Sequence, residues 1–237
     1  MSMDEARWKK AQGYEKQWWD HRKAAMDLEF YKYFADDLRQ QLSGVLEIKK
    51  ETRILEIGSG AAGILTFLKS ENRYAIDPLE SFYAAVPQFS TFRDPSVKYF
   101  TGKGEHLHFE SSFFDLIIMD NVLDHCEDPI QVVKEMIRVL KPNGIVFFRQ
   151  NIYHWWGKFI RQLMETIEID KGHPHTFTYS SLREIVSSNR LSTVRLKRSG
   201  YFQRWKRELF AGTKNDLIKA LLLVNRDKVL FILKKSI

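Results

Sequence analysis

Residues 53–63, RILEIGSGAAG, decide the fold of this chain. Arg53–Ile57 is a short apolar run that predicts a strand, and we expect a helix over Ile64–Lys69. The glycines between them, at 58, 60 and 63, allow a tight turn in which the backbone can approach a ligand closely. A strand that enters a glycine-rich turn and then a helix is typical of nucleotide-binding α/β folds.

Strands and helices continue to alternate after this turn. A helix is predicted over Ile130–Leu140 and should end at Lys141-Pro142-Asn143-Gly144, because proline and glycine terminate helices. Four further apolar runs predict strands: Tyr74–Ile76, Val97–Phe100, Phe114–Met119 and Ile145–Phe148. This alternation predicts an α/β fold, a doubly wound, mostly parallel, Rossmann-like sheet of seven strands with helices on both faces.

The two ends of the chain add to this core. Residues 4–50 carry aromatic and leucine side chains at helical spacing, which predicts an N-terminal helical cap. Near the C-terminus we expect a helix at Tyr179–Ser188, strands at Thr193–Leu196 and Lys228–Leu233, and between these strands a basic insertion, Lys197–Arg226. No linker is evident, so residues 1–237 are predicted to form one domain, with the cap at 1–50, the cofactor-binding core at 51–150 and the acceptor side at 151–237.

Composition excludes several classes of protein. With 237 residues, 44% of them hydrophobic and 14% aromatic, the chain can bury a sizeable core and is not a disordered protein. The single cysteine, Cys126, excludes an intramolecular disulfide framework. No apolar run approaches the roughly 20 residues of a membrane-spanning helix, and the first residues lack the apolar stretch of a signal peptide. We therefore expect a cytoplasmic location.

Charge is distributed unevenly along the chain. Residues 1–150 carry a net charge of −3 and residues 151–237 a net charge of +10. A basic C-terminal third could face an acidic substrate, a membrane surface or nucleic acid, or it could be a solvated surface. Six cations are candidates for holding phosphate or carboxylate groups: Arg195, Lys197, Arg198, Arg204, Lys206 and Arg207.

Two acidic residues bear on the ligand of the glycine turn. Asp77 ends the second predicted strand, where a carboxylate can hold ribose hydroxyls, so a nicotinamide dinucleotide and S-adenosylmethionine both remain candidates. Glu56 lies two residues before the first glycine, where its charge would repel a pyrophosphate. The same charge would attract the ammonium and sulfonium groups of S-adenosylmethionine. The residues therefore favour S-adenosylmethionine.

Four motifs in order resemble those of class I S-adenosylmethionine-dependent methyltransferases, in particular the group with a methyltransferase domain of the ubiquinone-biosynthesis type (methyltransferase type 11). ILEIGSGAAG resembles the first motif and YAIDP the second, TGKGEHLHF resembles the adenine-facing loop, and FDLIIMDNVLDHCEDPIQVVKEMIRVLKPNGIVFF resembles the fourth to sixth. The similarity runs from about Thr52 to Phe148. It is specific for the cofactor, whose product would be S-adenosylhomocysteine, and not for the methyl acceptor.

The resemblance implies roles for individual residues. The methionine end of the cofactor would be lined by Glu56, Gly58, Ser59, Gly60 and Gly63. The ribose and adenine would meet Asp77, Pro78, Gly104 and Glu105, and Asp120 with Asn121 would lie near the sulfonium. Lys103 stands where many relatives have an acidic residue facing the adenine amino group, so we expect backbone contacts there.

The histidines are the candidates for a general base that would activate an oxygen nucleophile. His125 follows the fourth strand at the ligand-binding edge, and His173 and His175 lie in a loop that could face the acceptor. His173 and His175 lack a convincing third ligand, so no metal site is predicted. Tyr14, Trp18 and Trp19 could form a lid or pack in the core, and Trp155 and Trp156 could wall the acceptor pocket or be exposed packing.

The sequence thus favours a methyltransferase for a small molecule or a saccharide, with O-methylation preferred and an anionic acceptor compatible with the basic third. Three alternatives remain open. They are an RNA or other nucleic-acid methyltransferase, a non-catalytic partner protein with the same fold, and an NAD-dependent oxidoreductase. The acceptor and the oligomeric state are not determined by these residues.

Overall fold

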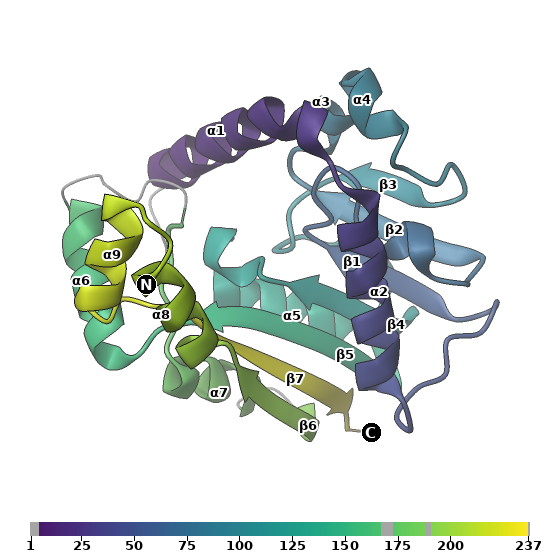
Figure 1. The fold of residues 1–237 in the computed structure, drawn as a ribbon. Helices are drawn as coiled ribbons and strands as arrows, with labels where there is room; N and C mark the ends of the chain where they lie inside the picture. Colours follow the sequence, from purple (N-terminus) through teal and green to yellow (C-terminus); the bar gives the residue numbers. More distant parts are fainter. Residues whose placement is uncertain (1–4, 167–172, 188–190, 237) are drawn as a thin grey trace.

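The computed structural model describes residues 5–166, 173–187 and 191–236, and its centre is one seven-stranded sheet in the order β3-β2-β1-β4-β5-β7-β6 (Figure 1). The first five strands pair in parallel, β7 is antiparallel to β5, and β6 is antiparallel to β7. The predicted doubly wound, mostly parallel sheet is therefore confirmed. The strands are β1 (Arg53–Ile57), β2 (Asn72–Asp77), β3 (Lys98–Thr101), β4 (Phe114–Asp120), β5 (Leu140–Ile152), β6 (Leu191–Ser199) and β7 (Asp227–Lys235).

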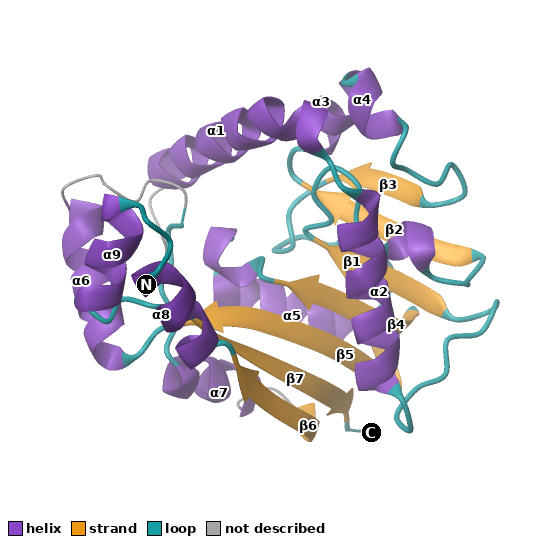
Figure 2. Ribbon diagram, in the orientation of Figure 1, coloured by secondary structure: helices purple, strands orange, loops and turns teal. Residues whose placement is uncertain are grey.

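Helices cover both faces of this sheet (Figure 2). On one face, α5 (Pro129–Val139) and α7 (Tyr179–Ser187) bury Val132, Met136 and Leu182 against the strands. On the other face, α2 (Leu28–Leu42) buries Leu38 and Leu42 against β1. Asp27 caps α2 and Asp128 caps α5, each accepting a hydrogen bond from a backbone N–H of the first turn. Ser188, the last residue of the predicted helix, lies outside the described residues.

The predicted helix at Ile64–Lys69 is wrong: a short 3-10 turn, Leu65–Phe67, stands in its place. The space that a crossover helix would fill is occupied by α2, whose Leu38 and Leu42 belong to the same buried cluster as Leu65 and Leu68. The fifth strand is also longer than Ile145–Phe148. It begins at Leu140 and passes through Lys141-Pro142-Asn143-Gly144, where its pairing with β4 shifts register.

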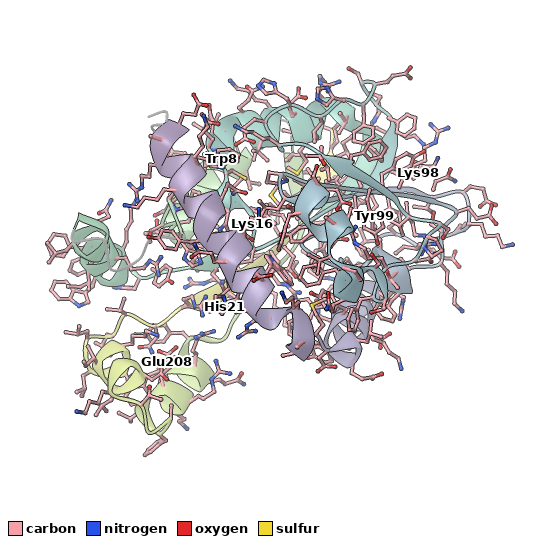
Figure 3. The ribbon with its side chains drawn as sticks, turned by 90° about the horizontal axis from the view of Figure 1, so that it is seen from above. Trp8, Lys16, His21, Lys98, Tyr99 and Glu208 are labelled. Atoms are coloured by element: carbon pink, nitrogen blue, oxygen red, sulfur yellow. The ribbon has the colours of Figure 1, made fainter. Side chains whose placement is uncertain are left out.

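The remaining helices lie around the carboxyl edge of the parallel strands. The helix α1 (Glu5–Arg22) arches over this edge from the side of α6 (Trp155–Thr166) and α9 (Lys214–Leu221) to α3 (Glu80–Ala85) (Figure 1). The view from above shows α1 crossing the molecule, with Trp8 and His21 far apart along it (Figure 3). The predicted N-terminal helices are present, and the basic insertion contains α8 (Tyr201–Leu209) and α9. The sequence did not predict α4 (Pro87–Ser90), α3 or α6.

None of the helices described is both long enough and apolar enough to cross a lipid bilayer.

Candidate active site

A cavity of about 770 Å³ is lined by residues of α1 and by residues at the carboxyl edge of the sheet. Ligands of doubly wound sheets bind at this edge, because the strand ends and the loops that follow them converge there. All eleven residues that the sequence assigns to the cofactor line the cavity: Glu56, Gly58, Ser59, Gly60, Gly63, Asp77, Pro78, Gly104, Glu105, Asp120 and Asn121. The structure thus brings these residues together, while their cofactor-binding roles remain a prediction.

The glycine turn after β1 requires glycine for two physical reasons. Gly58, Gly60 and Gly63 have φ angles of +71°, +60° and +71°, a region that L side chains rarely adopt. The space above the turn is also filled. A Cβ atom at Gly60 would lie 2.7 Å from Cζ2 of Trp19, and one at Gly63 would lie 2.6 Å from Oε2 of Glu56.

Two buried carboxylates flank this turn. The carboxylate of Glu56 accepts hydrogen bonds from the backbone N–H of Ile64 at 3.1 and 3.2 Å. The carboxylate of Asp77 accepts one from Gly60 and one from Leu79, each at 2.9 Å. Burial raises the pKa of Glu56 to about 8 and that of Asp77 to about 7, because little water is left to solvate the charged forms.

These raised pKa values predict a pH-dependent stability of the ligand-free protein. Both carboxyl groups bind protons in the folded state at pH values where the unfolded chain has released them, so the unfolding free energy should fall as the pH rises from about 4 to about 8. Between about pH 5.5 and about pH 8, Glu56 alone should lower the unfolding free energy by on the order of 3 kcal/mol. Urea unfolding at these two pH values measures the change. Glu56→Gln should flatten the profile, and identical profiles for the two proteins would contradict the assignment.

Arg149, at the end of β5, neutralises the acidic residue at the end of β4. Its guanidinium bonds both carboxylate oxygens of Asp120, pairs with Asp37 of α2 at 2.7 Å, and lies 4.3 Å from the Phe34 ring. Asn121, next along the chain, has a φ of +57° and accepts a hydrogen bond from the Asn151 N–H at 3.0 Å. Strained backbone of this kind often occurs at binding sites.

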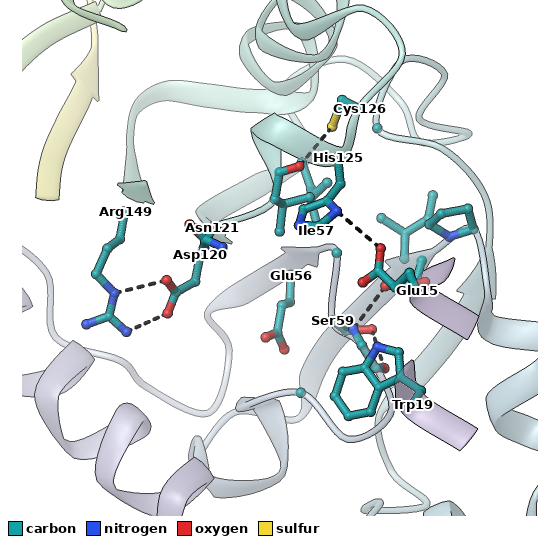
Figure 4. Close-up of a pocket in the computed structure, with 18 of the residues that line it drawn as sticks. Glu15, Trp19, Glu56, Ile57, Ser59, Asp120, Asn121, His125, Cys126 and Arg149 are labelled. Carbon is teal, nitrogen blue, oxygen red and sulfur yellow. Dashed lines mark hydrogen bonds and ion pairs between the residues drawn. The ribbon is translucent and has the colours of Figure 1, made fainter. Parts of the chain in front are cut away.

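Two of the three candidate histidines, His125 and His173, line the cavity. His125 lies on the other side of it from Arg149 (Figure 4). Nδ1 of His125 lies 3.4 Å from the carboxylate of Glu15 on α1, and its ring centroid lies 4.7 Å from that of His173. His175 is not among the lining residues. Its backbone N–H donates to the carbonyl of Asp124 and its ring stacks on Phe177.

The same cluster contains groups that can ligate metals. Asp124, His125 and His173 present such atoms within 4.8 Å of one another, and the Asp124 carboxylate accepts a hydrogen bond from Gln150 at 2.8 Å. That no metal binds here stays a prediction. The nearby Cys126 thiol is buried, which raises its pKa well above the ordinary value and leaves it a poor nucleophile.

The loop after β3 lines part of the cavity with residues 102–105. The Glu105 carboxylate accepts hydrogen bonds from the N–H groups of Glu127 and Asp128, at 2.7 and 3.0 Å, so its charge is directed to the start of α5. Lys103 pairs with Glu127 at 2.8 Å and lies over the Trp8 ring at 3.7 Å. Recognition of the adenine by the backbone of this loop stays a prediction.

Aromatic side chains of α1 form part of the cavity wall. Tyr14, Trp18 and Trp19 all line it, and Trp19 also packs edge-on against Tyr83 and Phe89. Trp19 thus packs against other aromatic rings, as one interpretation of this cluster expects, and the lid interpretation stays a prediction. Trp155 and Trp156 line neither described cavity, and Trp156 instead donates to the carbonyl of Leu222.

The six basic candidates of the C-terminal third differ in their surroundings. Arg195 bonds the carbonyls of Gln41 and Ser43, and Arg198 pairs with Asp227 at 3.1 Å. Lys206 lines no described cavity, whereas Lys197, Arg204 and Arg207 line a second cleft beside the first. That cleft also contains Arg149, Arg226 and Lys228, none of which the sequence singled out. Their positions at strand ends could have identified them. Because β7 is antiparallel to β5, the beginning of β7 lies at the edge where β5 ends.

Comparison with known proteins agrees with this geometry. Residues 55–148 match the family model described as a methyltransferase domain. An "Uncharacterized methyltransferase" of Mycobacteroides abscessus is 29% identical over 126 residues, which cover 52% of this chain and 47% of that protein. Malonyl-[acyl-carrier protein] O-methyltransferase of Marinomonas sp. is 27% identical over 131 residues, 53% and 48% of the two chains. The chain spans about half the length of these curated relatives.

A solved structure extends the likeness beyond the matched segment. Geranyl diphosphate C-methyltransferase from Streptomyces coelicolor A3(2), in complex with Mg²⁺, geranyl diphosphate and S-adenosyl-L-homocysteine, has a TM-score of 0.61 at 10% identity, with 85% of this chain and 79% of that chain covered. Such a likeness shows the fold. Together, the sheet, the glycine turn and the family match identify residues 55–148 as a methyltransferase domain of the class I S-adenosylmethionine-dependent family.

Proposed function

We propose that this protein transfers a methyl group from S-adenosylmethionine to an oxygen atom of a small molecule or a saccharide. One observation carries the proposal. A single cavity is lined both by the eleven residues expected to hold the cofactor and by His125, an imidazole paired with the acid Glu15. The cavity's volume, about 770 Å³, is typical of sites that enclose small ligands.

The donor set of the cavity fits the cofactor. Within the described part of the chain, Glu56 accepts hydrogen bonds from backbone N–H groups and no lysine or arginine pairs with it. A buried carboxylate without a counter-charge is unfavourable, so a cationic ligand such as the ammonium or sulfonium of S-adenosylmethionine would stabilise its ionised form. A pyrophosphate at the same place would be repelled.

Each part of the cofactor has residues to hold it. Glu56 and the glycine turn would hold the methionine end, and Asp77 would accept hydrogen bonds from the ribose hydroxyls. Each Asp77 oxygen accepts one backbone hydrogen bond and so retains a further lone pair. Pro78 and the backbone of Gly104 and Glu105 would face the adenine. When bound, the cofactor supplies a methyl group that is already activated by the positive sulfur.

The chain itself has to align the acceptor, exclude water and remove a proton. The helix α1 covers the cavity, with the Trp8 indole N–H donating to the carbonyl of His125 at 3.1 Å. Orientation in a dry cavity can contribute roughly 7–11 kcal/mol to such a displacement. His125 would take the proton of the acceptor hydroxyl, and the Glu15 carboxylate would stabilise the imidazolium formed.

Replacing His125 by asparagine should lower kcat by about 10²–10⁴-fold, because a positioned general base contributes that factor. The affinity for S-adenosylhomocysteine should change little, since His125 is not assigned to the cofactor. Transfer of labelled methyl groups and calorimetry measure the two quantities separately. His108→Asn, at an exposed loop position, is the control. Full activity of the His125 variant would remove the residue from the mechanism.

Identification of the product tests the proposed function itself. The protein is incubated with S-adenosylmethionine and with metabolite and glycan extracts, and mass spectrometry searches for a species that gains one methylene. Such a gain at an oxygen of a small molecule or saccharide is the expected result. A methylated RNA with no labelled small molecule would contradict the proposal, as would binding of the cofactor without any turnover.

A further inference from the structure

A second cleft, of about 480 Å³, opens directly beside the cofactor cavity. It lies between α2, the adjoining ends of β5 and β7, and α8. The two spaces share part of their lining, so a single ligand can extend from one into the other. The shared residues are Phe34, Arg149, Asn151, Arg204, Arg226 and Lys228.

Positive charge dominates the second cleft. Its lining contains six cations and one carboxylate, that of Asp37. Arg149 is paired with Asp120 and Asp37, and Arg204 with Glu208 at 2.8 Å. The other four cations of the cleft, Lys197, Arg207, Arg226 and Lys228, form no ion pair with any residue that the structure describes.

The pairing of β7 with β5 places two of these cations close together, although like charges repel each other. Arg226 immediately precedes β7, and Lys228 lies at the start of that strand, opposite Asn151 of β5. Partial burial, together with the charges of neighbouring arginines, lowers the pKa of both groups. Because like charges held together in a cleft oppose folding, an arrangement of this kind is expected where an anion binds.

We propose that this cleft binds a phosphate or diphosphate group of the methyl acceptor, with Arg226 and Lys228 as its main contacts and Lys197 and Arg207 at the rim. The inference rests on the proposed function and deepens it, since the acceptor would reach from this cleft to the edge marked by Asp120. Four cations without ion-pair partners match a multiply charged oxyanion, and arginine forks suit its geometry.

The distribution of the cations favours a small acceptor over a nucleic acid. On the surface strand β6, Arg195 and Arg198 are engaged by the carbonyls of Gln41 and Ser43 and by the carboxylate of Asp227. The four cleft cations without ion pairs surround a space that adjoins the cofactor cavity and is bordered by Tyr33 and Phe34. A nucleic-acid site would instead present a charged surface that tracks a phosphate backbone.

Calorimetric titration with sodium pyrophosphate tests the inference, with the full chain saturated in S-adenosylhomocysteine. The expected result is one site per chain, weakened about tenfold in Arg226→Gln and in Lys228→Gln, because each removes one charge-assisted contact. Lys228→Gln guards against misfolding, because part of the Lys228 side chain is open to solvent and the substitution leaves no cavity in the core. Arg183→Gln and Lys134→Gln, at exposed positions on α7 and α5, are the matched controls and should bind as the wild type does.

The outcomes separate this inference from the proposed function. If the wild type binds S-adenosylhomocysteine but not pyrophosphate, or if both cleft variants bind pyrophosphate as the wild type does, the inference is overturned and the proposed function stands. If S-adenosylhomocysteine itself does not bind, the proposed function fails. Tight binding of an RNA oligonucleotide that pyrophosphate does not displace would also overturn the inference.

Thermal unfolding gives an independent readout. Removing one cation from a cleft of like charges should raise the Tm of the ligand-free protein in Arg226→Gln and Lys228→Gln. A merely structural role would give the opposite sign. A lowered Tm in both variants, with pyrophosphate binding unchanged, would contradict the proposal.

Discussion

Replacing Gly60 by valine is expected to abolish binding of S-adenosylmethionine, with a loss of at least about 100-fold in affinity. Gly60 has a φ of +60°, which a β-branched residue adopts only with strain, and a Cβ atom there would lie 2.7 Å from the Trp19 ring. Its N–H also donates to Asp77, the residue proposed to hold the ribose. The substitution therefore displaces the turn, the acid and the covering helix α1 together.

Gly44→Val is the matched control for this variant. Gly44 has a φ of +74°, but a Cβ atom added there would meet no atom within 4 Å, so the control carries backbone strain without touching the cavity. It should lose stability and keep its affinity for S-adenosylmethionine. Calorimetry on both variants measures the difference. Equal affinities in the Gly60 variant and the wild type would show that the glycine turn does not contact the cofactor.

The affinity for S-adenosylmethionine is expected to rise at least tenfold between about pH 6 and about pH 8.5. In the ligand-free protein, burial sets the pKa of Asp77 at about 7 and that of Glu56 at about 8. A cationic ligand binds best to ionised carboxylates, so below these pKa values binding must release protons. Each decrease of one pH unit then lowers the affinity by up to about tenfold per group. Above about pH 8 the dependence should level off.

The Glu56→Gln variant isolates the larger of the two contributions. It should bind more weakly at high pH and show a flatter pH dependence, because one titrating carboxyl is gone. Any protonation of S-adenosylmethionine itself affects the wild type and Glu56→Gln equally, so it cancels when their pH profiles are compared. Glu110→Gln, at an exposed position, should behave as the wild type does. Parallel pH profiles for the wild type and Glu56→Gln would exclude Glu56 from the cationic end of the site.

The sequence could predict the cofactor side of the cavity because of one geometric rule. Arg53–Ile57, Tyr74–Ile76 and Phe114–Met119 are local apolar patterns, and parallel strands place their carboxyl ends at one edge. Residues that follow those strands, such as Asp77 and Asn121, are then brought together whatever their separation in the chain. All eleven predicted residues line the cavity for this reason.

The features that the sequence did not predict depend on packing between segments that are far apart in the chain. The expected helix at Ile64–Lys69 is replaced by a 3-10 turn because α2 occupies that face, and local periodicity does not reveal a competitor elsewhere in the chain. Arg226 and Lys228 reach the cavity only because β7 runs antiparallel, a direction that its own pattern leaves open. The contact of Glu15 with His125 depends on the path of α1 over the sheet.

Calorimetric titration of the full chain with S-adenosylmethionine, and in parallel with NADH, tests the central claim most directly. The buried carboxylates beside the glycine turn predict one site per chain for S-adenosylmethionine and no heat from NADH. Binding of NADH by a chain that does not bind S-adenosylmethionine would contradict the account.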